Sequence, residues 1–213
     1  MLIGIDYSMT SPAVTIQTAE GYKFLAFPRK GGINKNCLDS LYSLDVDVRL
    51  VPDPVTVKKS WDLAQIESVS TKEAIKQTDI IIATLKEYTA GHSNIAIAIE
   101  GLSYGSIGNR LTQISGFHWV LRYRLMELGV SPDNIFIFAP TTVKRTAGKG
   151  NFKKEDVIDA FVKSPDIALV ENKFWTSLVK DPSIVQTKTG KWQKPIDDIV
   201  DSYWVLKTLE NYI

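Results

Sequence analysis

The stretch that most constrains the fold is a short apolar run near the start of the sequence that ends in a carboxylate. Residues Leu2–Ile5 are apolar or glycine, Asp6 follows them, and a polar turn leads into a second apolar run at residues 13–16. Apolar runs bounded by turn residues are typical of buried strands. An acid at the end of such a strand is costly unless it is solvated, hydrogen-bonded or bound to a cation. Taken alone, Asp6 is most simply a solvated acid, because buried carboxylates are rare.

Two later stretches favour a different role for Asp6. Residues 95–100 form another apolar run that ends in an acid, Glu100. Residues 197–201 carry three more acids on what the pattern predicts to be the final helix. Two strand acids and a helical acid pair can converge on one divalent metal site. The simpler alternative for Glu100 is an acid that caps a neighbouring helix.

Composition limits the class of metal site. A single cysteine, Cys37, excludes an internal disulfide and a cysteine-rich zinc site. The two histidines, His92 and His118, are too few and too scattered for a histidine-based centre. Any metal should therefore be a hard cation held by oxygen, such as Mg²⁺ or Mn²⁺.

Composition also limits the class of protein. The 213 residues suit one domain, which we expect to span residues 1–213. No apolar run approaches the ~20 residues of a membrane span, and no signal peptide is visible, so we expect a cytoplasmic protein with no membrane contact. The net charge of +1 does not indicate a nucleic-acid partner, so evidence for one must be local.

The order of predicted elements indicates an α/β fold. We expect three strands within residues 2–28, a helix over 71–89, a strand at 95–100, a helix over 107–128, a strand at 135–138, and helices over 153–163, 170–180 and from about Pro195. Ser70 or Thr71 would cap the first helix, with Glu73 completing a capping box. Residues 29–60 are predicted to be an insertion. An antiparallel meander followed by alternating units gives a mixed sheet flanked by helices, in the ribonuclease H-like arrangement.

Five motifs then occur in the order found in one family. They are Gly4-Ile5-Asp6, Ile99-Glu100, Gln113-Ile114-Ser115-Gly116, a basic stretch from Pro140 to Val157, and Asp198-Ile199-Val200-Asp201. Together they resemble the RuvC-type Holliday junction resolvases, over most of the chain outside residues 29–60. Tyr7-Ser8 replaces the usual Pro-Gly after the first acid, and the spacing from Lys144 to Gly148 is one residue shorter. These departures lead us to expect a divergent, viral-type relative.

The resemblance implies a magnesium-dependent endonuclease that resolves four-way DNA junctions by phosphodiester hydrolysis, in DNA recombination and repair. Two Mg²⁺ ions per site, replaceable by Mn²⁺, would activate a water and stabilise the leaving oxygen. Asp6 would bridge both ions, Glu100 would bind one, and Asp198 and Asp201 the other. Helical periodicity does not choose between Asp197 and Asp198, and only the family spacing favours Asp198. The alternative role of these acids is compensation of the helix dipole, worth ~0.3–1 kcal/mol each.

The basic stretch is predicted to contact DNA. By resemblance Lys154 lies near the scissile phosphate, and the other basic residues contact phosphates: Lys144, Arg145, Lys149 and Lys153. The alternative is a solvated basic loop that begins a helix. By resemblance, Tyr104 sits where the family carries an aromatic residue that wedges into the junction. A core tyrosine is about as plausible. Asn109 and Arg110 would contact phosphates on the same face. Trp192, among lysines, is predicted near DNA or an interface, whereas Trp119, Trp175 and Trp204 are predicted to be core.

Other functions remain open at this stage. One is another ribonuclease H-like nuclease, acting on RNA–DNA hybrids or of the terminase type, and another is a non-catalytic DNA-binding protein on the same fold. Retention of every acid favours an enzyme. Because a four-way junction has approximate two-fold symmetry, we expect a homodimer. The candidate contact is the 107–128 helix with Phe117 and Trp119, although this face also packs on the sheet in part.

Overall fold

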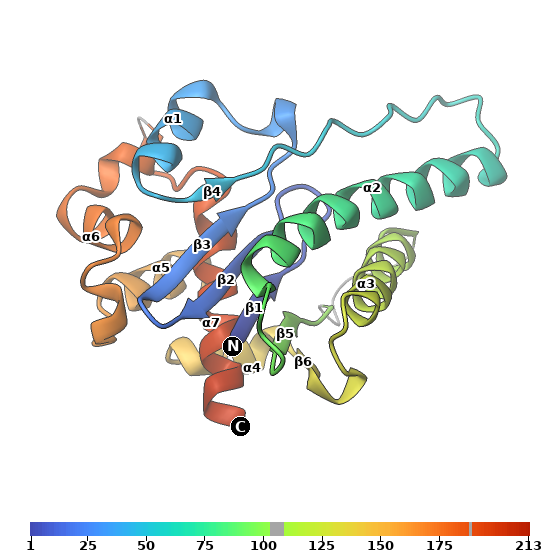
Figure 1. Ribbon diagram of the computed structural model, residues 1–213. Helices are drawn as coiled ribbons and strands as arrows, with labels where there is room; N and C mark the ends of the chain where they lie inside the picture. Colours follow the sequence, from blue (N-terminus) through green and yellow to red (C-terminus); the bar gives the residue numbers. More distant parts are fainter. Residues whose placement is uncertain (103–108, 188) are drawn as a thin grey trace.

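A six-stranded mixed sheet forms the centre of the computed structural model, which describes residues 1–102, 109–187 and 189–213 (Figure 1). The strands are β1 (Leu2–Asp6), β2 (Ala13–Thr18), β3 (Gly21–Ala26), β4 (Asp47–Val48), β5 (Ala96–Glu100) and β6 (Ile135–Phe138). Their order is β4-β3-β2-β1-β5-β6, with β1, β2 and β3 antiparallel and with β5 parallel to β1 and to β6. This confirms the predicted ribonuclease H-like arrangement.

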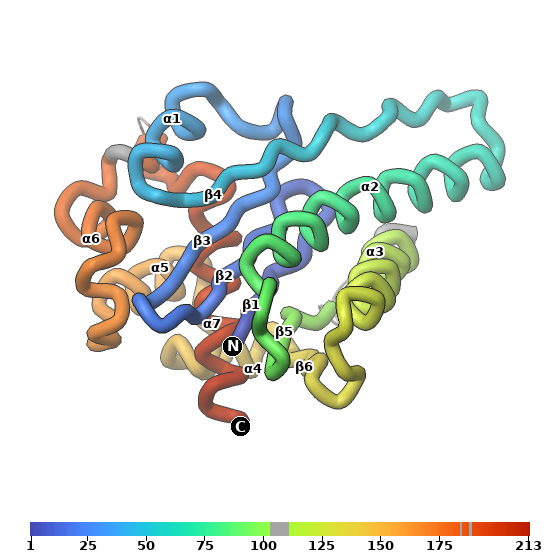
Figure 2. The backbone as a smooth tube through the Cα atoms, viewed as in Figure 1, coloured from blue at the N-terminus to red at the C-terminus, as the bar shows by residue number. Residues whose placement is uncertain are grey.

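Helices cover both faces of the sheet. They are α1 (Lys35–Ser43), α2 (Leu63–Thr89), α3 (Asn109–Glu127), α4 (Pro140–Ala147), α5 (Lys154–Val162), α6 (Lys173–Lys180) and α7 (Ile196–Tyr212), and the 3₁₀ turns are η1 (Lys30–Gly32), η2 (Pro132–Asn134), η3 (Ile167–Leu169) and η4 (Pro182–Val185). In Figure 2, α2 and α3 lie on one side of the sheet and α7 on the other. No helix in the described ranges has the length and apolar character that a bilayer crossing requires.

Side chains alternate between the two faces along each strand, as pleating requires. Ile3 and Ile5 point to the α2 and α3 side, where they pack in a core with Ile81 and Leu121. On the other side, residues of β2 and β3 pack in a second core with α5, α6 and α7. The central strand β1 is therefore covered on both faces.

The contact between α7 and β1 is unusually close. A Cβ atom added to Gly4 would lie 2.3 Å from the carbonyl oxygen of Ser202 and 2.4 Å from the backbone nitrogen of Leu206. The Ser202 hydroxyl also shares a 2.7 Å hydrogen bond with the Thr15 hydroxyl on β2. Glycine at position 4 thus lets the helix backbone rest directly on the strand, which fixes the height of α7 above the sheet.

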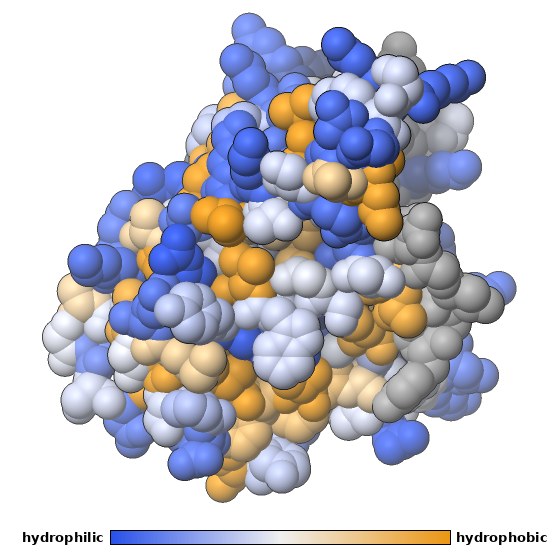
Figure 3. All heavy atoms as spheres, turned by 90° about the vertical axis from the view of Figure 1, so that its right-hand side faces the viewer, coloured by the Kyte–Doolittle hydropathy of each residue, from blue (hydrophilic) through white to orange (hydrophobic). Residues whose placement is uncertain are grey.

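The start of α2 corrects the sequence prediction. The helix begins at Leu63 rather than residue 71, and Asp62 with Gln65 forms the capping box assigned to Ser70 and Glu73. Residues 52–68, which include these first turns, project from the body (Figures 1 and 2). Leu63 is 70% exposed. Figure 3 shows hydrophobic residues scattered among hydrophilic ones on this upper, projecting part. Helix turns without a buried face lack the apolar periodicity that marks a helix in sequence.

Other elements also differ from the prediction. Within residues 29–60, α1 buries Cys37 and Leu41, and β4 extends the sheet by pairing with β3. The helix α4 was not predicted, because Pro140 was taken to end a strand, whereas it occupies the first turn of this helix, where proline is tolerated. Trp119 is 65% exposed and lies against Arg122, so its prediction as a core residue was wrong.

We predict that Gly4→Ala destabilises the protein by about 1–3 kcal/mol, because the added methyl group forces α7 away from β1. Chemical denaturation would measure the change in the free energy of unfolding. Gly116→Ala is the matched control, because a Cβ at Gly116 meets nothing within 4 Å and alanine favours the helix. Equal stability of the Gly4 variant and the wild type would contradict the close contact.

Candidate active site

Two of the predicted acids lie at the same edge of the sheet. Strands β1 and β5 are parallel neighbours with Ile5 opposite Ile99, so Asp6 and Glu100 follow at adjacent strand ends. Asp6 is 9% exposed and Glu100 is half-buried. These acids therefore lie at the ends of adjacent central strands, as convergence of the two predicted strand acids requires.

The helix α7 brings the remaining acids to this edge. Its first two turns carry Asp197, Asp198 and Asp201, of which Asp198 is only 3% exposed. Because α7 rests on β1 at Gly4, these turns lie over the end of the strand that carries Asp6. Acids separated by nearly the whole sequence therefore meet in one place.

The pKa values show how strongly the carboxylates interact. Burial raises the pKa of Asp6 well above its ordinary value, and Asp198, Glu100 and Asp201 raise it further. Burial also raises the pKa of Glu100 to about 7 and that of Asp201 to about 8; Asp198 adds to both shifts, and Lys144 opposes the first. Each carboxylate thus makes ionisation of the others harder, and a nearby cation would relieve this repulsion.

Asp197 is in a different electrostatic position. Burial would raise the pKa of Asp197, but the ammonium groups of Lys194 and Lys154 outweigh it and lower that pKa. Lys194 pairs with both Asp197 and Asp198, and Lys154 pairs with Asp197. Asp198 raises the pKa of Asp6, and Asp197 raises the pKa of Asp198 and of Asp201. Both acids therefore lie within the electrostatic reach of the group, and the preference for Asp198 rests on the family spacing.

Lys194 is a site residue that sequence reasoning missed. It precedes Asp197 and Asp198 by three and four residues, a spacing that allows one ammonium group to reach both carboxylates. This spacing is visible in the sequence, but Lys194 lies before the predicted start of the helix at about Pro195, so helical periodicity does not single it out. The structure places its charge among the acids.

The acids have the oxygen donors and the negative charge that a hard cation requires, but their side chains are not arranged to hold one. Across the described ranges, no group of three or more His, Cys, Asp or Glu side chains is placed to hold a metal ion. Asp197 and Asp198 are instead turned toward lysine ammonium groups. In the described residues, the buried Oδ1 of Asp197 and the buried Oδ2 of Asp198 have no hydrogen-bond partner. Carboxylate oxygens are the ligands that Mg²⁺ and Mn²⁺ prefer.

The predicted basic residues lie on two short helices and the link between them. Lys144 and Arg145 are in the last turn of α4, Lys153 caps α5 and Lys154 begins it. Lys144 and Lys154 oppose the raised pKa of Glu100, so both lie close to the acids. Arg145, Lys153 and Lys149 are exposed. Lys149 lies in the link before α5, and Lys153 and Lys154 stand at the start of that helix, so the alternative of a solvated basic loop that begins a helix also fits.

Other predicted residues are placed differently or not described. Tyr104 lies outside the described residues, as do the side chains of Asn109 and Arg110. Trp204 is buried, at 8% exposure, as predicted. Trp175 and Trp192 are partly buried against the core on the α7 side. The location of Trp192 near DNA stays a prediction.

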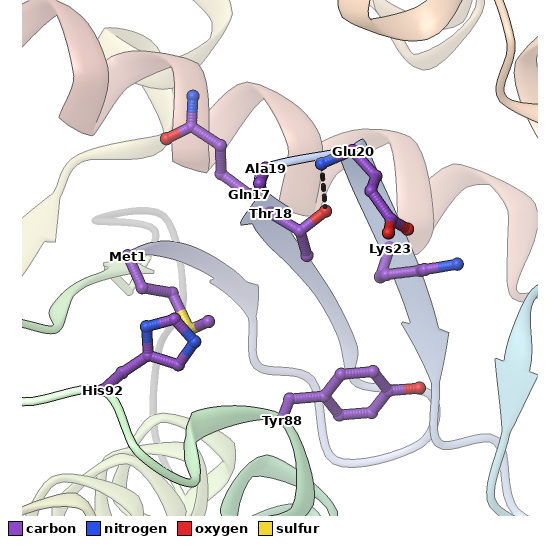
Figure 4. Close-up of a pocket in the computed structure, with 8 residues that line it drawn as sticks. All are labelled: Met1, Gln17, Thr18, Ala19, Glu20, Lys23, Tyr88 and His92. Carbon is purple, nitrogen blue, oxygen red and sulfur yellow. Dashed lines mark hydrogen bonds between the residues drawn. The ribbon is translucent and has the colours of Figure 1, made fainter.

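Two hollows of the surface differ in chemistry. One of about 220 Å³ is lined by Asp6, Glu100, the turn Tyr7–Thr10 and His118. A larger one of about 540 Å³ lies at the opposite edge of the sheet, beside Met1, Thr18 and Tyr88 (Figure 4). None of the predicted site residues lines the larger hollow, whereas Asp6 and Glu100 line the smaller one.

Comparisons with known proteins concern the fold. No protein-family model matches the chain, and no curated protein matches its sequence. Thermus thermophilus RuvC in complex with a Holliday junction substrate is 15% identical, with a TM-score of 0.47, over 99% of this chain and 93% of that chain. Another structure of Thermus thermophilus RuvC is 15% identical, with a TM-score of 0.45, over the same shares. The yeast mitochondrial Holliday junction resolvase is 12% identical, with a TM-score of 0.37, over 97% and 76%.

We predict that Lys194→Met lowers the free energy of unfolding by about 1–3 kcal/mol without metal, because Asp197 and Asp198 lose a charged partner. Millimolar Mg²⁺ should raise the thermal midpoint of this variant more than that of the wild type, since a cation then meets carboxylates without a competing ammonium group. Lys163→Met, at an exposed pair with Asp159, is the control. Equal stabilisation of both proteins by Mg²⁺ would show that Lys194 does not compete with the cation.

Proposed function

We propose that the protein is a magnesium-dependent endonuclease that hydrolyses phosphodiesters at four-way DNA junctions. The observation that carries this proposal is the meeting of Asp6, Glu100, Asp198 and Asp201 at one sheet edge, with raised pKa values and with lysines beside them. A buried group of acids is destabilising unless a cation or protons neutralise it, so its presence indicates a function. The family resemblance of the motifs supplies the substrate class.

The acids would hold the metal in the manner of other phosphodiester hydrolases. When bound, two Mg²⁺ ions make a water nucleophilic and stabilise the leaving oxygen. Asp6 would contact both ions, Glu100 one, and Asp198 and Asp201 the other, with Mn²⁺ able to substitute. Burial of these carboxylates removes water from around them, and this strengthens their interaction with a cation.

The lysines would act on the DNA. Lys154 is held beside the acids through Asp197, where its ammonium group can contact the scissile phosphate. Arg145, Lys149 and Lys153 extend the positive charge along the surface and would contact neighbouring phosphates. Such contacts position DNA without reading its sequence, as a structure-selective enzyme requires.

We also propose that a second copy of the chain binds the outer side of α3. The inner side packs on the sheet, where Phe117 is only 3% exposed, so Phe117 is not available for the contact. The outer side presents Trp119, Tyr123 and Met126, which are 65%, 58% and 40% exposed. These residues recur at helical spacing as one stripe. A two-fold dimer would present two equivalent sites to the two strands of a junction.

We predict that Asp6→Asn lowers the cleavage rate at least about a thousandfold, because losing a metal ligand removes several kcal/mol of transition-state stabilisation. Binding of junction DNA should be retained. The assay compares a mobile four-way junction, a linear duplex and an RNA–DNA hybrid, each with and without Mg²⁺, and exposed Asp133→Asn is the control.

The same assay separates the alternatives. Preferential cleavage of the hybrid would favour a ribonuclease H activity, and binding without cleavage of any substrate would favour a non-catalytic DNA-binding protein. Cleavage at near wild-type rate by the Asp6 variant would refute the role of Asp6.

We predict that neutralising Lys149 and Lys153 together, as Lys149→Gln with Lys153→Gln, weakens binding to all DNA shapes. The slope of log affinity against log salt should become shallower by roughly one to two units, because two phosphate contacts are lost. The control is Lys163→Gln with Lys173→Gln, two exposed lysines that pair with other acids. An unchanged slope in the Lys149 and Lys153 variant would remove this segment from the DNA interface.

We predict that Trp119→Ser with Tyr123→Ser converts a dimer into a monomer, measured by sedimentation. Replacing Ile167 and Val170 by serine is the control, because these residues are as exposed but lie elsewhere. A wild-type monomer that still cuts both strands of a junction in one encounter would overturn the dimer proposal.

A further inference from the structure

The backbone that follows Asp6 is held by side chains of α2. The amide nitrogen Nε2 of Gln77 donates to the Ser8 carbonyl oxygen at 2.9 Å. The Tyr7 hydroxyl shares a 2.7 Å hydrogen bond with the Thr78 hydroxyl. Gln77 and Thr78 are 0% exposed, so both bonds are shielded from water.

A buried arginine holds the next residue of the same segment. The guanidinium group of Arg29 donates through Nε and Nη2 to the Met9 carbonyl oxygen, at 3.3 Å in each case. Its Nη1 donates to the Pro52 carbonyl oxygen at 2.8 Å and pairs with Glu73 of α2 at 3.0 Å. Glu73 thus keeps the guanidinium in place, and Arg29 ties Met9 to both α2 and residue 52.

These polar residues are not needed to pack α2 on the sheet. Apolar side chains on the same helix already do so, among them Ala74, Ile81 and Leu85. Burying polar side chains costs free energy unless they are hydrogen-bonded. Three such residues, Glu73, Gln77 and Thr78, occur in the turns of α2 that pass the end of β1, and Gln77 and Thr78 bond to the segment after Asp6 directly.

Other contacts also hold this segment. The Tyr7 ring is buried, the Ser8 hydroxyl accepts from the Ser11 nitrogen at 3.0 Å, and the backbone nitrogen of Arg29 donates to the Thr10 carbonyl oxygen at 3.1 Å. Residues 7–10 contain neither proline nor glycine and form no strand or helix. They leave the sheet directly after Asp6 and line the hollow that Asp6 and Glu100 share. A shift of their backbone would therefore move the Asp6 carboxylate relative to the other acids.

We propose that Arg29, Glu73, Gln77 and Thr78 form a positioning clamp, which fixes the Tyr7–Met9 backbone and so aims the Asp6 carboxylate at the metal. The clamp rests on the proposed role of Asp6 as a metal ligand. Its residues do not touch the reacting atoms and act through Asp6 alone. Misplacement of a reacting group by about 1 Å can slow a reaction about a hundredfold, so a few hydrogen bonds at this place matter for the rate.

Gln77→Met is the sharpest test. Methionine has nearly the same volume, and it removes both the bond to Ser8 and the Oε1 oxygen of Gln77, which is buried without a partner in the described residues. The Ser8 carbonyl oxygen loses its Gln77 partner, but Ser8 is only partly buried, so water can replace this bond and the fold should lose little stability. Arg29 variants are less useful, because they leave Glu73 buried without its partner. Thr84→Val is the matched control, since Thr84 is also buried on α2 but bonds only to Ile80 of its own helix.

Two measurements on the Gln77 variant do not depend on cleavage. Hydrogen exchange of the metal-free protein should become about tenfold faster in residues 7–11 and stay unchanged elsewhere, as expected for the loss of one hydrogen bond. The Mg²⁺ concentration that gives half-maximal thermal stabilisation should also rise about tenfold. Junction binding without metal should not change, and cleavage should fall at low Mg²⁺. The Thr84 variant should match the wild type throughout.

The outcomes separate the clamp from the nuclease assignment. Unchanged exchange in residues 7–11, or faster exchange with an unchanged Mg²⁺ requirement, would overturn the clamp alone. A wild-type protein that is stabilised by Mg²⁺ but cleaves no DNA would refute the nuclease proposal, and the exchange and Mg²⁺ results would still decide on the clamp. Absence of any stabilisation by Mg²⁺ would refute the metal site and the clamp together.

Discussion

The direct backbone contact between α7 and β1 at Gly4 is the constraint on which the acid cluster depends. A side chain at this position would hold the helix further from the strand, and Ser202 could not reach Thr15. The first turns of α7 would then stand away from the end of β1. The absence of a side chain at Gly4 thus sets how near Asp198 comes to Asp6.

Bringing the acids close together creates the candidate site but lowers the stability of the folded protein. Neighbouring buried carboxylates resist ionisation, so their pKa values are raised. Ion pairs with lysines offset the negative charge that remains. Lys194 is central to this compensation because it contacts two acids at once. If the proposed metal binds here, the stability lost in this way is the cost of a site kept ready for it, as in many active sites.

The sequence predicted the elements that have a strong apolar pattern and missed those that depend on distant partners. The three strands of the meander and the strands that end at Glu100 and Phe138 were predicted because each is a short apolar run bounded by turn residues. The last helix was predicted from Pro195 and the acids that follow it. The start of α2 was missed because its first turns are exposed on most sides. The bond from Gln77 to Ser8 spans 69 positions, so no local pattern could indicate it. Trp119 was misassigned because aromatic residues are usually buried, and sequence alone does not tell which side of a helix faces the solvent.

The distance in sequence between β1 and α7 has a consequence during synthesis. Residues 2–6 leave the ribosome well before residues 196–212, because most of the described chain lies between them. At roughly 5–20 residues per second, β1 waits on the order of 10–40 s for the helix that covers its second face. During that time Asp6 and Glu100 lack Asp198 and Asp201, so a nascent chain has no assembled acid cluster. The same wait leaves uncovered the face of β1 that α7 contacts, so chaperone binding to the nascent chain should concentrate on this strand until α7 emerges.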